Sequence, residues 1–173
     1  MLSRAPSHAA GNRAGVFTVA AIVGLLAVVG LFTWQYAMPG GTMLILRGIA
    51  NAENPRGQLD DNSAKLYALS SGYGGQVLDV AGGTAEQMQL ALARIRNDPR
   101  VSALYGFSGG GYASAKIWSQ LSEDERARIR KVVIVGAPGI TEASFPGARQ
   151  VVIQPDPPEG HMAGPWALLQ SWK

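Results

Sequence analysis

The sequence predicts an α/β fold: a three-layer α/β/α sandwich with a mostly parallel sheet of about five strands, preceded by one N-terminal transmembrane helix. Two observations predict the layered domain. From residue 42 onward, short apolar runs alternate with segments of helical periodicity, and turn-forming residues separate them. A third observation, an uncharged apolar run behind basic residues near the N-terminus, predicts the membrane helix.

The N-terminal segment is expected to anchor the chain in a membrane. Residues 16–34 carry no charge, and about 20 apolar residues suffice to cross a bilayer as a helix. Arg4 and Arg13 precede this run, so the positive-inside rule places the N-terminus in the cytoplasm and the following domain outside it, which is the periplasm in a bacterium. A cleaved signal peptide is the alternative, although its apolar region is shorter, at roughly 7 to 15 residues. The expected divisions are a leader over residues 1–15, a signal-anchor over 16–36, a linker over 37–41 and a domain over 42–173.

Charge and cysteine content exclude several kinds of chemistry. The chain has 15 Lys and Arg residues against 12 Asp and Glu residues, and most of this excess comes from Arg4 and Arg13. The basic residues within 126–131 follow three acids at 123–125, which is typical of a solvated helix face, so nucleic acid is not an expected partner. The absence of cysteine excludes disulfides, thiol catalysis and Cys-ligated zinc.

Five short apolar runs are expected to form the sheet. The first, TMLIL, is apolar on both faces, which is typical of a strand buried on both sides of a parallel sheet. It is followed by residues 48–62, whose Gly, Asn, Asp and Pro predict a long loop. Ligands bind outside the carboxyl ends of the strands in such sheets, so functional residues are expected directly after strands. The expected strands are residues 42–46, 76–80, 101–107, 132–135 and 151–154.

Helical segments are expected between these strands. Two of them carry capping-box patterns, Thr84 with Gln87 and Ser122 with Glu125, in which each side chain satisfies a free backbone N–H of the other residue. The helix behind Thr84 is expected to end at Asn97, because Asp98 and Pro99 follow. The other expected helices cover residues 63–70, 109–121 and 167–172.

The candidate catalytic motif follows the third expected strand. Residues 106–110 read Gly-Phe-Ser-Gly-Gly and match G-x-S-x-G, with an apolar strand before them and a helix of small residues after them. This pattern forms a tight turn that exposes the serine hydroxyl at the top of the sheet, and Gly106 and Gly110 let the chain pass closely. Ser108 is therefore the candidate nucleophile, and the N–H of Gly109 is a candidate donor to an oxyanion.

The glycine-rich turn has other possible interpretations. A plain turn in which Ser108 caps a helix stays open as the simplest alternative. A phosphate-binding P-loop is excluded, because Lys116 is not preceded by glycine and is followed by Ile117. A dinucleotide-binding turn is excluded because G-x-G-x-x-G does not occur.

A serine nucleophile needs a base, which near neutral pH is usually histidine. The chain contains two histidines, and His8 lies in the leader on the other side of the expected membrane. His161 is therefore the candidate base. It follows the last expected strand, and the order of serine before histidine fits an α/β architecture. The alternative is a solvated loop residue.

The candidate acid is Asp156, which follows the fifth expected strand. It precedes His161 by five residues, and Pro157 and Pro158 stiffen the turn between them. Asp79, near the end of the second expected strand, is a second and weaker candidate for the acid. A plain turn residue before proline is the alternative interpretation of Asp156.

The second oxyanion donor is expected in the loop after the first strand. The N–H of Ile49 or of Ala50 is the candidate, and Gly48 gives the backbone the freedom to aim it. Asp60 and Asp61 lie in the same loop. Because adjacent side chains diverge, they are interpreted as solvated acids or a helix N-cap rather than as a metal pair.

Three segments, TMLILRG, YGFSGGG and DPPEGHMAGP, together resemble a short, minimal member of the α/β-hydrolase superfamily, of the size class of cutinase-like and small esterase domains. The resemblance covers residues 42–173, and only its G-x-S-x-G segment is specific. It implies a mechanism with Ser108 as nucleophile, His161 as base and Asp156 as acid, and no metal or organic cofactor. The chain departs from the family in having fewer strands, no lid domain and no cysteines for the cutinase disulfides.

The function predicted from these observations is that of a membrane-anchored serine esterase acting on a small acyl ester. A thioesterase or an acyltransferase would use the same residues. A catalytically inactive α/β-hydrolase-like binding module is the alternative of a different class. The sequence leaves the oligomeric state open.

Overall fold

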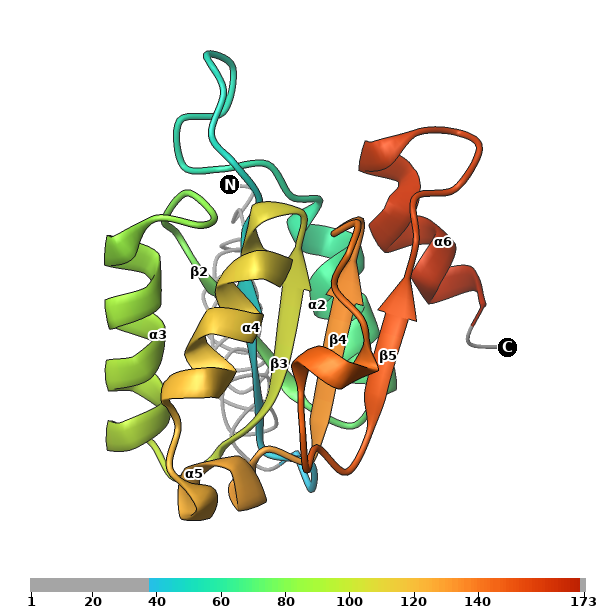
Figure 1. Ribbon diagram of the computed structural model, residues 1–173. Coiled ribbons are helices and arrows are strands. Elements are labelled where there is room, and N and C mark those ends of the chain that lie inside the picture. The colour runs from blue at the N-terminus through green and yellow to red at the C-terminus, as the bar shows by residue number, and fades with distance from the viewer. Residues whose placement is uncertain (1–37, 172–173) are drawn as a thin grey trace, which may run out of the picture. The chain divides into compact units, whose positions relative to one another are not determined.

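A five-stranded, fully parallel sheet forms the centre of the domain (Figure 1). The computed structural model describes residues 38–171, so the expected leader and membrane anchor lie outside the described residues. Within residues 38–171, no helix combines the length and the apolar character needed to cross a membrane. The strands are β1 (Thr42–Leu46), β2 (Gly74–Leu78), β3 (Val101–Phe107), β4 (Lys131–Val135) and β5 (Val151–Gln154).

The helices cover both faces of the sheet. One face packs against α3 and α4, and the other packs against α2 and α6 (Figure 1). The prediction of a parallel sheet of about five strands between helical layers is therefore confirmed. The helices are α2 (Asp61–Ser70), α3 (Ala85–Asn97), α4 (Gly109–Gln120), α5 (Glu123–Arg128) and α6 (Gly164–Gln170), with short 3-10 turns η1 (Glu142–Ser144) and η2 (His161–Ala163).

Alternation along the central strands creates two hydrophobic cores. On β1, Leu44 and Leu46 face the core under α3 and α4, whereas Met43 and Ile45 face the core under α2 and α6. Successive side chains of a strand point to opposite faces, so a strand buried on both faces must be apolar throughout. All seven residues of β3 are buried, which places this strand in the middle of the domain.

The strand order determines where a functional site can form. The order is β2-β1-β3-β4-β5, so the chain first moves outward from β1 to β2 and then returns to the other side of β1. The connections therefore diverge between β1 and β3, and ligands of open α/β sheets bind at the carboxyl ends of strands beside such a switch point. The pairing of Leu46 with Gly106 places the loops after β1 and β3 side by side at that point.

Several expected elements have other boundaries in the structure, among them α2, which begins at Asp61 rather than at residue 63. Strand β2 covers Gly74–Leu78 rather than residues 76–80, because pairing with Thr42 and Met43 of β1 brings Gly74 and Gly75 into the sheet. Helix α6 begins at Gly164 rather than at residue 167, because Pro165 fits the first turn of a helix, where its missing N–H needs no partner.

The assignment of Lys131 to a solvated helix face was also wrong. Lys131 is the first residue of β4 and is 4% exposed, with its ammonium group 5.0 Å from the centre of the Tyr67 ring and 3.3 Å from the Ser71 hydroxyl. The aromatic ring and the hydroxyl compensate for the loss of hydration. The preceding Ser122–Glu125 capping box is confirmed, and α5 follows it as expected.

The core predicts how a truncation in β3 changes stability. We expect Leu104→Ala to lower the free energy of unfolding by about 2–5 kcal/mol, because Leu104 is fully buried and its loss leaves a cavity. Leu90→Ala is the matched control: Leu90 is 43% exposed, so the same change costs less than about 0.5 kcal/mol. Urea unfolding of the full-length chain measures both, and equal effects would contradict the assignment of Leu104 to the core.

Candidate active site

Ser108 occupies the sharp turn between β3 and α4. Its backbone has φ 51° and ψ −117°, and among residues 38–171 it is the one residue other than glycine with a positive φ. Such a conformation costs about 1–3 kcal/mol and persists only where the surroundings enforce it. The Ser108 N–H donates to the carbonyl of Val135 at 2.8 Å, and its carbonyl accepts from Gly111 at 2.8 Å. These bonds hold Ser108 at the carboxyl end of the sheet.

Glycines around Ser108 make this turn sterically possible. A Cβ on Gly106 would lie 2.5 Å from the carbonyl oxygen of Gly110, and one on Gly110 would lie 2.6 Å from the carbonyl oxygen of Arg47. Real Cβ atoms do not approach backbone atoms so closely, so the start of α4 packs against the ends of β1 and β3 only because both residues are glycine. The two glycines of the G-x-S-x-G pattern therefore have the packing role that the pattern predicts.

Asp156 and His161 form a hydrogen-bonded pair. The Nδ1 atom of His161 lies 2.8 Å from Oδ1 of Asp156, and both side chains are 35% exposed. The five-residue spacing works because the chain turns back between them, with the Gly160 N–H donating to the carbonyl of Pro157 at 2.9 Å. Gly160 has a φ of 106°, which favours glycine in this turn. The structure thus brings the expected base and acid together.

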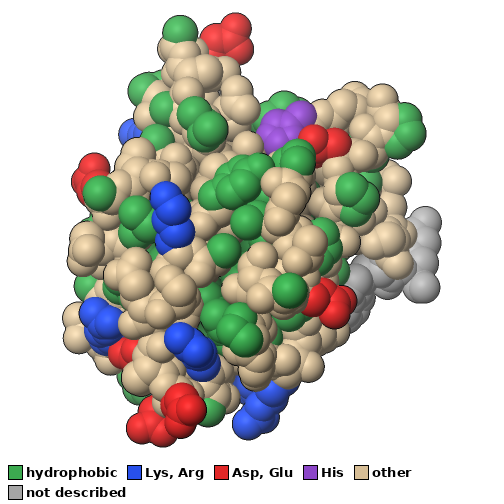
Figure 2. Space-filling view, in the orientation of Figure 1, with side chains coloured by type: hydrophobic (Ala, Val, Ile, Leu, Met, Phe, Trp, Pro, Cys, Tyr) green, Lys and Arg blue, Asp and Glu red, His purple; other side chains and the backbone are tan. Residues whose placement is uncertain are grey.

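The imidazole of His161 lies next to the nucleophile turn. Its ring stacks on the ring of Phe107, the residue before Ser108, with centroids 4.8 Å apart and planes at 28°. The hydrogen bonds of residues 38–171 include none between Ser108 and His161, and in enzymes without bound substrate this contact is often long. Figure 2 shows the histidine at the surface, with hydrophobic side chains gathered beside it. Phe107 was not among the expected site residues, because the pattern leaves its position unspecified.

Gly136 provides the space in which the acid and the base meet. This residue follows β4, and a Cβ built on it would lie 2.5 Å from Oδ1 of Asp156 and 2.8 Å from Cε1 of His161. Its φ of 59° also favours glycine. No local signal in the sequence distinguishes this role of Gly136 from that of an ordinary turn glycine.

The two residues that carry the candidate oxyanion donors, Gly109 and Ile49, lie close together at the switch point. A Cβ on Gly109 would lie 3.2 Å from the backbone nitrogen of Ile49, and a Cβ on Gly48 would lie 3.1 Å from Cβ of Ser108. Among residues 38–171, neither the Ile49 N–H nor the Gly109 N–H donates a hydrogen bond. Both N–H groups are therefore unpaired within this part of the chain, as an oxyanion hole requires. The backbone nitrogen of Ala50, the other candidate donor, is not among the nearest atoms to Gly109.

The remaining acids of the sequence analysis lie elsewhere. Asp79 pairs with Arg47 at 3.4 Å and with Arg56 at 3.1 Å, so its carboxylate is committed to two cations rather than to His161. Asp60 caps α2 by accepting from two backbone N–H groups, as the N-cap interpretation predicts, and Asp61 pairs with Arg47 at 2.7 Å. Within residues 38–171, no group of three or more His, Asp or Glu side chains has a metal-binding arrangement.

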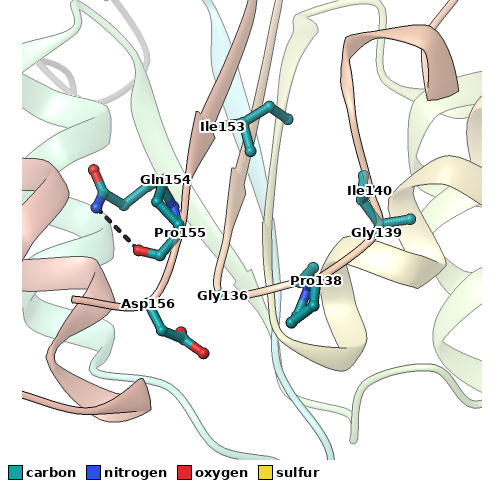
Figure 3. Close-up of a pocket in the computed structure, with 9 residues that line it drawn as sticks. Gly136, Pro138, Gly139, Ile140, Ile153, Gln154, Pro155 and Asp156 are labelled. Atoms are coloured by element: carbon teal, nitrogen blue, oxygen red, sulfur yellow. Dashed lines mark hydrogen bonds between the residues drawn. The ribbon is translucent and has the colours of Figure 1, made fainter. Parts of the chain in front are cut away.

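A cavity of about 270 Å³ borders Asp156. The segment after β4 forms one wall and the end of β5 forms the other, with Asp156 at the rim and Gly136 between the walls (Figure 3). The apolar side chains of Pro138, Ile140 and Ile153 lie along it. The hydroxyl of Tyr112 donates to the carbonyl of Pro138 at 2.6 Å and so ties this wall to α4.

The contact at Gly136 predicts how the site responds to one methyl group. We expect Gly136→Ala to displace the Asp156–His161 pair and to slow the reaction of Ser108 with a fluorophosphonate by about a hundredfold or more. Gly147→Ala is the control, because Gly147 also has a positive φ, of 79°, yet nothing lies within 4 Å of its missing Cβ. Labelling rates of the two variants compare them directly. Equal labelling rates in the two variants would mean that backbone strain, and not displacement of the Asp156–His161 pair, determines the labelling rate of Gly136→Ala.

No model of a known protein family matches the chain, and no curated protein matches it significantly in sequence. Among solved structures, the chain is similar to Trichoderma reesei cutinase in complex with a C11Y4 phosphonate inhibitor. The two share 18% sequence identity, with a TM-score of 0.50, over 94% of this chain and 90% of the cutinase chain. At this identity the similarity shows the fold alone. The domain has the α/β-hydrolase fold that the resemblance implied.

Proposed function

We propose that this protein is a serine hydrolase that cleaves a carboxylic ester through an acyl-enzyme on Ser108. The observation that carries the proposal is the Asp156–His161 pair, 2.8 Å apart, beside the strained turn at Ser108. A turn of this kind, a free pair of backbone N–H groups and an acid-oriented imidazole are the parts that acyl transfer requires. The cutinase fold of the domain supports the same chemistry.

The first step is attack of the Ser108 hydroxyl oxygen on the ester carbonyl carbon. Because Nδ1 of His161 faces Asp156, the proton of a neutral imidazole resides on Nδ1, and Nε2 is free to accept the serine proton. Asp156 stabilises the imidazolium that forms. The N–H groups of Gly109 and Ile49 bind the oxygen that becomes negative in the tetrahedral intermediate.

The second half of the reaction returns the enzyme to its starting state. His161 gives its proton to the alkoxide as the carbon–oxygen bond breaks, so the alcohol leaves neutral and the acyl group stays on Ser108. A water molecule, deprotonated by His161, then attacks the acyl carbon, and the intermediate collapses to free acid and Ser108. The cavity of about 270 Å³ beside Asp156 offers room for a short group of the substrate.

The assignment of the three residues is tested by ester hydrolysis. We expect the full-length protein to hydrolyse p-nitrophenyl acetate or a longer-chain ester, and we expect Ser108→Ala, His161→Ala and Asp156→Asn each to lower kcat/KM by about a thousandfold or more. Glu159→Gln is the matched control for Asp156→Asn, because Glu159 is an exposed acid in the same turn and should not affect turnover.

The same assay distinguishes the enzyme from a binding module. Rates of the wild-type protein equal to those of Ser108→Ala, together with no fluorophosphonate label on Ser108, would replace the esterase proposal with that of an inactive α/β-hydrolase-like module. Activity that survives Asp156→Asn but not His161→Ala would leave the dyad in place and remove Asp156 from its role.

We further propose that residues 16–36 anchor the enzyme in a membrane, with the hydrolase domain outside the cytoplasm. The support is the uncharged run over residues 16–34 behind Arg4 and Arg13. We expect the full-length chain to stay in the membrane pellet after alkaline carbonate washing, and we expect Leu25→Arg with Val28→Arg to release it. Recovery of a shortened, soluble chain from the wild-type gene would indicate a cleaved signal peptide instead.

A further inference from the structure

Arg47, the residue that follows β1, is buried beside the candidate oxyanion hole. Its side chain is 9% exposed, and its Nη2 atom lies 2.7 Å from Oδ2 of Asp61 and 3.4 Å from Oδ1 of Asp79. Its Nη1 atom donates to the carbonyl of Gly57 at 3.3 Å. One guanidinium therefore connects the end of β1, the start of α2, the end of β2 and the loop between β1 and α2.

Fold stability alone is a weak explanation for this arrangement. Removing the Arg47 guanidinium from water is costly, because its partners Asp61 and Asp79 stay 33% and 52% exposed, and an apolar side chain of similar volume often stabilises a fold equally well. Two atoms of the pair, Nε of Arg47 and Oδ1 of Asp61, are buried without a hydrogen-bond partner among the described residues. The cluster is thus only partly satisfied, and its function is better sought in what it holds in place.

The segment that Arg47 holds carries the Ile49 N–H. The Gly48 N–H donates to the carbonyl of Gln58 at 2.8 Å, and the Gln58 N–H donates to the carbonyl of Ile49 at 3.2 Å. Gly57, which accepts from Arg47, is the neighbour of Gln58. The guanidinium therefore fixes the part of the loop around Gly57 and Gln58, to which Gly48 and Ile49 are hydrogen-bonded. It does so without contacting Ser108 or the cavity.

The main chain of Arg47 is held by a hydrogen bond from Gln87. This side chain is fully buried at the start of α3, and its Nε2 atom donates to the carbonyls of Arg47 at 3.3 Å and Val80 at 3.0 Å. Its Oε1 atom accepts from the Gly83 N–H at 3.1 Å, and the adjacent Gly82 N–H donates to the carbonyl of Gly48 at 2.6 Å. Both ends of the Arg47 residue are therefore immobilised next to Ile49.

We propose that Arg47 is a positioning residue, which holds the Ile49 N–H in the oxyanion hole through its contacts with Gly57, Asp61 and Asp79. This inference rests on the proposed esterase function. Arg47 touches neither the substrate nor the reacting atoms, and it acts through the loop. A donor that is displaced from the oxyanion loses most of its effect on turnover, while the binding of the ground-state ester changes little.

The test compares kcat per active site, counted by fluorophosphonate titration of the full-length protein. We expect Arg47→Met to lower this kcat by about 10- to 100-fold, with KM and the pH profile unchanged, because only a transition-state contact weakens. Arg47→Lys should recover part of the loss, since an ammonium group keeps the charge but cannot contact Gly57 and both carboxylates at once. A merely structural residue would lower the number of titrated sites and leave kcat per site unchanged.

Two further variants separate positioning from stability. Arg56→Met is the matched control, because Arg56 lies in the same loop and pairs with Asp79 at 3.1 Å, but its side chain is 71% exposed; its kcat should not change. If Arg47→Met fails to fold, the double variant Arg47→Met with Asp61→Asn carries the test, since it also removes the charge of the carboxylate that has lost its nearest cation. We expect this double variant to fold and to keep the low kcat.

The outcomes distinguish this inference from the proposed function. Wild-type kcat per titrated site in Arg47→Met, or in the folded double variant, would overturn the positioning role and leave the esterase standing. Absence of label and turnover in the wild-type protein would overturn both. An equal loss in Arg47→Met and Arg56→Met would assign the effect to the loop charges in general and would also overturn the proposal.

Discussion

The turn at Ser108 is the constraint on which the site depends. A serine with a φ of 51° stores strain, and the strain is offset by hydrogen bonds to Val135 and Gly111 on either side of it. These bonds tie the end of β3 to the end of β4 and to the first turn of α4. Had the chain relaxed at this position, α4 would leave the sheet at another angle, and Gly109 would no longer lie beside the loop after β1.

The other parts of the site can approach this turn because glycines, which have no side chain, occupy the points of contact. A Cβ would collide with a neighbouring segment at Gly82, at Gly110 and at Gly136, and each of these contacts joins segments that follow different strands. Gly82 lets the loop after β2 lie against the loop after β1, and Gly136 leaves room for Asp156 and His161. Close backbone packing at these glycines therefore brings together the segments in which the chemistry is proposed to occur.

Much of this arrangement is accessible from the sequence because its signals are local. Strands β1, β3 and β5 coincide with short apolar runs, and the exposed serine turn is marked by five consecutive residues. The Asp156–His161 pair can also be predicted from the sequence, because the two residues lie close in the chain and a proline-rich turn joins them. Where the chain departs from local rules, as at the glycines of β2, pairing with a neighbouring strand decides the conformation.

Contacts between distant segments could not be predicted in this way, and Gln87 shows why. The Thr84–Gln87 pattern predicts a capping box, and half of it forms, since the Gln87 N–H donates to the Thr84 hydroxyl at 3.1 Å. The Gln87 side chain is directed away from the N-cap N–H of Thr84 and hydrogen-bonds instead to Val80, Gly83 and Arg47, the last of these 40 residues away in the chain.

The physical reason is burial. At an exposed helix end, water competes for the side-chain amide, and the nearby N-cap N–H is its usual partner in the protein. Gln87, however, is fully buried, where every unpaired backbone group costs about 1–3 kcal/mol. An amide that satisfies three backbone groups of converging loops is then more stable than one that satisfies a single helix end. Which loops converge is determined by the strand order, with β1 between β2 and β3, and no window of sequence around Thr84 contains that information. The residues proposed to react are thus encoded locally, whereas those that hold them in place are encoded by the topology.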